Sequence, residues 1–236
     1  MKRRLRLLFS MCFLAFCFVV AGCESLEGDV PGPQGELELA PVASQSSSLA
    51  TVLAVAKDAL PGYLHEGTAH LFTNPEDMKV AEVSDFVIPT LDVDSSRLQD
   101  DSDLESLLVD AQSWQVLVTA HGKPVAWMRV ERMDGELQVV AFGFAARAEQ
   151  VFSVLQQWPA AAGYQHVSVE SKNPRGEFIA VSQENQRIGL VPLSPGLMFL
   201  GMNPRAFDPA MIVDSVPFVN RLQELRAAPN AGTILQ

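Results

Sequence analysis

The chain has 236 residues, 48% of them apolar, and carries 17 Lys and Arg against 28 Asp and Glu, a net charge of −11 at pH 7. This length and apolar content fit one or two compact domains and exclude polymeric and wholly disordered chains. The acidic balance argues against nucleic-acid binding, because phosphate contacts need clustered Lys and Arg.

The N-terminus has the order of a secretory signal peptide. Four basic residues in the first six are followed by an uncharged, mainly apolar run over residues 7–22, whose 16 residues fall short of the roughly 20 that a spanning helix needs. Residues 20–23, Val-Ala-Gly-Cys, resemble the lipobox of bacterial lipoproteins. The resemblance implies cleavage before Cys23, diacylglycerol on its sulfur and acylation of the new terminus. The alternatives are an ordinary secreted protein and an uncleaved inner-membrane anchor.

Cleavage would divide the chain into three parts. Residues 1–22 are the expected signal peptide, residues 23–48 a lipid-attached tether, and residues 49–236 a single domain. The stretch after Cys23 holds three Pro, three Gly and five carboxylates but no basic residue, which is typical of a segment that buries too little surface to fold. Glu24, not Asp, follows the Cys, so the Gram-negative sorting rule favours the outer membrane. The mature chain would carry a net charge of −15 and one acylated cysteine, which leaves no thiol for disulfides, metals or catalysis.

The first folded elements are helical. Apolar residues at helical spacing predict a helix over 49–60, which a Pro-Gly pair ends. An apolar strand is expected over 86–91. The spacing predicts a second helix over 104–111, with Ser102 and Glu105 placed as a capping box.

Six further strands form two predicted meanders, separated by a helix over 148–155. Turn residues such as an Asp-Gly pair separate the strands of the first meander. A Pro-rich and Met-rich crossover over 192–217 precedes a C-terminal helix that starts near Asp214. The predicted strands are 114–120, 125–132, 137–142, 164–170, 177–182 and 187–193.

These elements predict an α+β fold. Residues 103–143 and 145–193 have the layout of two successive α-β-β-β units, so we expect antiparallel meanders with the helices packed on one face. The layout resembles that of cystatin-like and PepSY-like extracytoplasmic domains. This resemblance concerns the fold alone and implies no particular activity.

Acidic residues concentrate before residue 111, and five oxygen-bearing side chains there follow the spacing of a calcium loop. Residues 49–110 contain thirteen acidic and three basic residues, whereas residues 111–236 sum to zero. Arg97 stands where a calcium loop needs Gly for its turn, and its last residue is Asp in place of Glu. We therefore interpret the segment as a solvated acidic loop that caps the next helix, with a calcium site as the alternative. The calcium candidates are Asp92, Asp94, Ser96, Asp100 and Asp103.

Two other motifs are incomplete. The Asp-x-Asp-x-Ser pattern that starts at Asp92 resembles the nucleophile motif of haloacid-dehalogenase-type phosphatases, but Pro89 interrupts the strand before it and the further motifs are missing. His65 and His70 are five residues apart, whereas two zinc ligands on one helix face need a spacing of four. His121 is expected in a hairpin turn and His166 within a strand.

The sequence favours a binding or scaffolding protein of the bacterial envelope over an enzyme. No cofactor is expected, and the expected partners are the bilayer, through acylated Cys23, and a protein or peptide of the envelope. The crossover over 192–217 is either a Met-rich partner surface or part of the core. The alternative function is an envelope hydrolase, either calcium-dependent or calcium-independent, with its site in the acidic loop over 92–103.

Overall fold

The computed structural model describes residues 42–143, 145–184 and 186–227, with backbone alone for residues 42–48 and 187. All of them belong to one of the two compact units of the chain, Leu37–Gln236, and the other unit, Met1–Glu36, lies outside the described residues. The predicted signal peptide and Cys23 therefore also lie outside them. No helix of the described part is long and apolar enough to cross a membrane.

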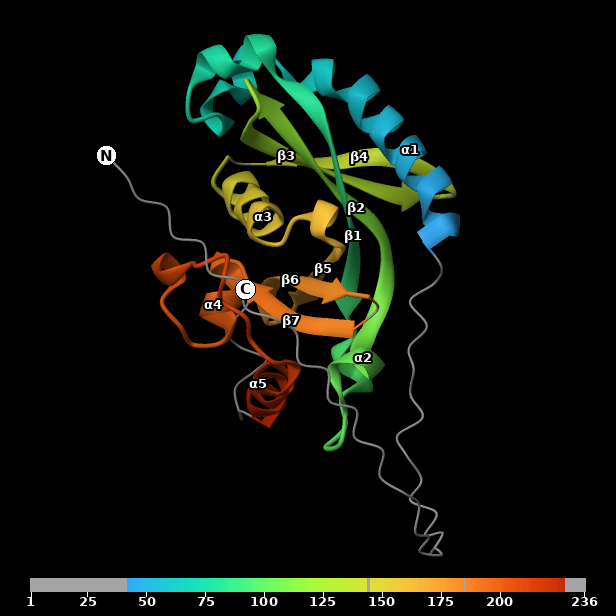
Figure 1. The fold of residues 1–236 in the computed structure, drawn as a ribbon, viewed down its shortest axis with the longest axis vertical. Coiled ribbons are helices and arrows are strands. Elements are labelled where there is room, and N and C mark those ends of the chain that lie inside the picture. Colours follow the sequence, from blue (N-terminus) through green and yellow to red (C-terminus); the bar gives the residue numbers. More distant parts are fainter. Residues whose placement is uncertain (1–41, 144, 185, 228–236) are drawn as a thin grey trace, which may run out of the picture. The chain divides into compact units, whose positions relative to one another are not determined.

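The strands form a seven-stranded sheet in the order β4-β3-β2-β1-β5-β6-β7 (Figure 1). All neighbouring pairs are antiparallel except β1 and β5, which run parallel. The predicted strands lie within the observed ones, apart from a one-residue excess at the end of 187–193. The strands are β1 (Glu82–Val93), β2 (Leu108–Ala120), β3 (Lys123–Met133), β4 (Glu136–Gly143), β5 (Tyr164–Lys172), β6 (Arg175–Gln183) and β7 (Gln186–Pro192).

Five α-helices and six 3₁₀ helices connect or cover the strands of the described chain. α1 begins at Val42, within the segment predicted as a tether, and ends where the Pro-Gly pair was expected to stop it. The α-helices are α1 (Val42–Ala59), α2 (Leu104–Leu107), α3 (Ala145–Gln157), α4 (Ser194–Phe199) and α5 (Ser215–Ala227). The 3₁₀ helices are η1 (Leu60–Tyr63), η2 (Glu66–Leu71), η3 (Pro75–Val80), η4 (Ser95–Arg97), η5 (Ala160–Ala162) and η6 (Pro204–Ala206).

Helices cover both faces of the sheet, which corrects the prediction that they pack on one face. Val116 and Val118 of β2 pack with Val52 and Ala56 of α1. Leu117, between those two valines, packs in a second cluster with α3. Successive side chains of a strand point to opposite faces, so α1 and α3 lie on opposite sides of the sheet. The α+β class and the order of the two α-β-β-β units are confirmed.

A third cluster, on the same face as α1, joins α2, α4 and α5 to the second meander. The rings of Phe178, Phe199 and Phe218 meet within it, with centroids 4.8 to 5.8 Å apart. Gly196 lets α4 approach β6 closely, since a Cβ at that position would lie 2.3 Å from the carbonyl oxygen of Glu177. At the beginning of the crossover over 192–217, Gly196, Leu197 and Phe199 are therefore part of the core.

The helix predicted over 104–111 is wrong beyond its first turn. α2 ends at Leu107, and β2 begins at Leu108, which pairs with Val93 of β1. Its N-cap is Asp103, whose carboxylate accepts a hydrogen bond from the Ser106 N–H at 2.8 Å, whereas the expected cap was Ser102. Pairing with β1 outweighs a local helical pattern because each residue added to the sheet also gains cross-strand packing.

β1 is paired along its length on one side and over three residues on the other. It pairs with β2 from Glu82 to Val93, with a bulge between Val83 and Val87. On its other side β5 pairs only with residues 90–92. In the described part of the chain, residues 82–89 therefore have no strand partner on the side away from β2. This unpaired edge of β1 lies between α1 and α3 (Figure 1).

Candidate functional site: a groove along the open edge of β1

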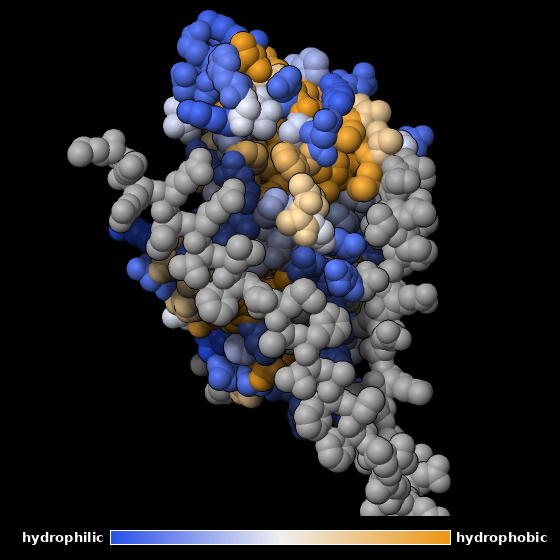
Figure 2. Space-filling view, in the orientation of Figure 1, coloured by the Kyte–Doolittle hydropathy of each residue, from blue (hydrophilic) through white to orange (hydrophobic). Residues whose placement is uncertain are grey.

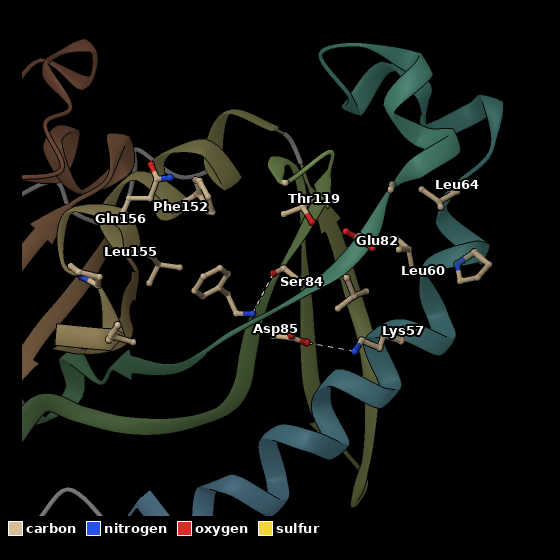
Figure 3. Close-up of a pocket in the computed structure, with 18 residues that line it drawn as sticks. Lys57, Leu60, Leu64, Glu82, Ser84, Asp85, Thr119, Phe152, Leu155 and Gln156 are labelled. Carbon is tan, nitrogen blue, oxygen red and sulfur yellow. Dashed lines mark hydrogen bonds and ion pairs between the residues drawn. The ribbon is translucent and has the colours of Figure 1, made fainter. Parts of the chain in front are cut away.

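A groove of about 1250 Å³ runs along the open edge of β1. Residues 81–86 form its base, α1 and η1 contribute one wall, and the C-terminal half of α3 with η5 contributes the other. Figure 3 shows Leu60 and Leu64 on the α1 side and Phe152 and Leu155 on the α3 side of β1. The groove forms because α1 and α3, which lie on opposite faces of the sheet, both extend beyond the unpaired edge of β1.

The strand at the base of the groove is irregular and carries an exposed aromatic ring. Residues 84–86 bulge away from β2, and the Phe86 N–H donates a hydrogen bond to Ser84 Oγ at 3.3 Å. Phe86 is 44% exposed, and its ring meets that of Phe152 edge to face, with centroids 6.2 Å apart. A large exposed ring beside a concave apolar wall is typical of a binding surface.

Two acidic side chains of β1 line the groove. Asp85 forms an ion pair with Lys57 at 3.6 Å, yet its side chain remains 91% exposed. Glu82, on the same strand, is also exposed and lines the groove. Two carboxylates and one ammonium group therefore line the groove, in a part of the chain whose overall charge is strongly negative.

A buried ion network lies on the α3 face of the sheet. Glu170 of β5 accepts from Arg129 of β3 at 2.6 Å and from Arg147 of α3 at 2.8 Å. Gln115 adds a hydrogen bond to the same carboxylate at 2.9 Å, and Arg147 reaches Glu177 at 3.2 Å. The network joins two meanders and a helix, and its charges pair with one another.

Burial alone would raise the pKa of the Glu170 carboxyl, but the guanidinium groups of Arg147 and Arg129 outweigh burial and lower it. Arg147 also stacks over the Trp127 ring, 4.2 Å from its centroid. Trp127 lies directly on Gly143, where any Cβ would overlap the indole. Because every charged group has a partner, this arrangement fastens α3 to the sheet and offers no free acid, base or nucleophile.

The predicted calcium candidates have separate roles. Asp92 lies at the end of β1 and pairs with Lys172. Asp94 accepts from the Ser96 N–H and hydroxyl, which lower the pKa of its carboxyl, and it also pairs with Arg97. Within the described residues no group of three or more His, Cys, Asp or Glu is placed to hold a metal ion.

Asp103 caps α2, and Asp100 is an exposed residue whose backbone carbonyl accepts from the Gln223 side chain. Calcium binding by this segment remains a prediction. Its acidic side chains act mainly as local caps and surface pairs, which matches the first interpretation of the segment.

The histidines take structural positions. His65 caps η2, and its Nδ1 accepts from the Gly67 N–H at 3.1 Å. His70 lies at the end of the same 3₁₀ helix, and His121 occupies the expected hairpin turn with a φ of 52°. His166 lies on β5, where burial lowers its pKa despite a hydrogen bond with the Trp158 backbone.

The Met-rich crossover is divided between core and surface. Leu197 and Phe199 are buried, whereas Met198 and Met202 are 57% and 40% exposed. Figure 2 shows that hydrophobic side chains also reach the surface along α1 and beside it, with hydrophilic side chains around them. The larger hollow belongs to the β1 edge and not to the crossover.

No family model, curated protein or solved structure matches the chain. Sequence reasoning missed the groove, because its base is created by the parting of β1 and β5, which no local pattern encodes. It also missed the ion network, although Gln115, Arg129 and Glu170 were visible as polar residues inside predicted strands.

Proposed function

We propose that this chain is a lipid-anchored binding module of the bacterial envelope, and that the groove along β1 is its binding surface. The observation that carries the proposal is the open edge of β1 between two helical walls. The groove exceeds the roughly 300 to 1,000 Å³ of sites for small molecules, and so suits a polymeric partner. None of its described lining residues is Cys, and its ionisable side chains are Lys57, Glu82 and Asp85, which suit the recognition of a charged partner.

The position of the groove is compatible with anchoring at Cys23. Eighteen residues separate Cys23 from Val42, the first residue of α1. A chain of that length spans at most about 65 Å. Acylation of Cys23 would therefore keep the groove close to the membrane that holds the lipid, where it would meet other envelope proteins.

Site-specific photo-crosslinking in a Gram-negative host tests the binding function. A photoreactive residue at position 156 replaces Gln156, which is exposed and lines the α3 wall. The matched control carries it at position 149, since Glu149 is exposed on the same helix about two turns earlier, away from the groove. We expect discrete adducts from position 156 that disappear when Ala161, on the groove wall, is replaced by Arg. Equal labelling from both positions, or none from position 156, would contradict the proposal.

A further inference from the structure

We infer that the occupant of the groove is an extended, Lys-bearing or Arg-bearing peptide segment that adds to the sheet as a strand along residues 82–88 of β1. This inference depends on the proposed binding function and specifies the chemistry of its partner. It rests on the open strand edge, on the two walls that would receive alternate side chains, and on the negative charge of Glu82 and Asp85 at the groove.

The strand edge itself selects an extended backbone. Between residues 82 and 89 no described strand pairs with β1 on the side away from β2. Residues 82–86 of this stretch line the groove, so main-chain groups there lack a strand partner on that side. An extended peptide satisfies such an edge with main-chain hydrogen bonds, as in other cases of strand addition. Because of the bulge, residues 82–88 lie opposite only five residues of β2, from Gln115 to Thr119. The open edge is therefore about 17 Å long, and a heptapeptide covers it with about one residue to spare at each end.

The walls would receive the side chains of the added strand. α1 and α3 lie on opposite faces of the sheet, and side chains of a strand alternate between the two faces. One set would therefore pack against Phe152 and Leu155 of α3, and the other would approach Lys57, Leu60 and Leu64. An apolar residue in every second position fits the α3 wall.

The negative charge of Glu82 and Asp85 favours a basic peptide over a second copy of this chain as the occupant of the groove. Asp85 is almost fully exposed and Glu82 stands beside it on the same strand. Two copies meeting edge to edge would bring these carboxylates together, and like charges facing each other across strands are destabilising. A Lys or Arg in the added strand would instead meet carboxylates that Lys57 balances only in part.

The test uses synthetic heptapeptides in which Lys and Val alternate, with blocked ends, against the purified chain with its N-terminal 22 residues absent and Cys23 replaced by Ser. One N-methylated version has methyl groups on the Val amides and another has them on the Lys amides. In an added strand only one of these sets faces β1. We expect one N-methylated peptide to bind like the parent and the other to lose roughly tenfold or more in affinity, because several main-chain bonds are lost together.

Two further readouts accompany the affinities. Amide hydrogen exchange should slow at residues 82–88 when the parent peptide is bound. Asp85→Lys should weaken the Lys peptide about twofold to fivefold, in a salt-dependent manner, and strengthen a Glu-Val version. Asp101→Lys is the matched control, because Asp101 is an exposed carboxylate of the acidic segment outside the groove.

Equal affinities for both N-methylated peptides, or no added protection at residues 82–88, would overturn strand addition. If adducts from position 156 persist in that case, the groove binds its partner in another form and the proposed function stands. If those adducts are missing, the proposed function itself fails.

Discussion

Glu170 is the residue through which α3 is fastened to the sheet. Its carboxylate receives two guanidinium groups and a Gln amide while only 7% of the residue remains exposed. A buried charge group of this kind is costly to break, because removing one member leaves the others without compensation. The α3 wall of the groove therefore depends on a residue that lies outside the groove.

Glu170→Gln should destabilise the fold by roughly 2 kcal/mol or more, because Arg129 and Arg147 would lose the buried counter-charge that they share and would keep only Glu131 and Glu177 as partners. Chemical denaturation with a matched Glu149→Gln control on the exposed side of α3 measures this loss. A change below about 0.5 kcal/mol, typical of surface substitutions, would show that the network contributes little.

The same residue predicts a pH dependence. The pKa of Glu170 lies below its ordinary value of 4.5 in the folded protein, so its stabilisation is present above about pH 4.5 and is lost as the pH falls through the lowered value. The difference in unfolding free energy between the native chain and Glu170→Gln should therefore shrink below pH 4.5. A difference that is constant from pH 7 to pH 3 would contradict the assignment.

At the scale of elements, hydrophobic periodicity predicted those helices and strands that a local residue pattern determines. Alternation and turn residues gave all seven strands, and the apolar face of α3 was visible in residues 148–155. α2 shows the limit, since Leu108 and Ala111 fit a helix but lie in β2. Leu108 pairs with Val93 of β1, and Ala111 lies at an irregularity of the same pairing, between Asp110 and Ser113. Which face of the sheet each helix covers could not be predicted from the sequence either, because it depends on the path of the chain between elements.

The N-cap of α2, which is Asp103 and not the expected Ser102, can be tested by substitution. Asp103→Ala should lower stability by about 1 kcal/mol, because the Ser106 N–H loses its acceptor, while Asp101→Ala should have almost no effect. Thermal denaturation of both variants measures the difference. A larger effect at Asp101 than at Asp103 would mean that the capping residue has been misassigned.

At the scale of the whole molecule, the fold class was predictable and the groove was not. Seven strands with interspersed helices fix an α+β architecture, but the parting of β1 from β5 arises from how two meanders join in one sheet. The acidic excess before residue 111 was visible from the start, and the structure places part of it, Glu82 and Asp85, at the groove.

The anchor is a separate expectation of the proposal. Cys23→Ser should release the protein from the membrane fraction or leave the signal peptide uncleaved, because the sulfur that would receive the lipid is lost. Membrane fractionation with mass spectrometry of the N-terminus measures both. Unchanged fractionation and unchanged mass would show that Cys23 carries no lipid.

The most direct measurement of the central claim is competition for the groove in isolated envelopes. The Lys-Val heptapeptide should suppress adducts from position 156, and the N-methylated version that loses affinity should leave them in place. Adducts that persist at saturating Lys-Val peptide would contradict the claim that an extended segment on the open edge of β1 is how this protein binds its partner.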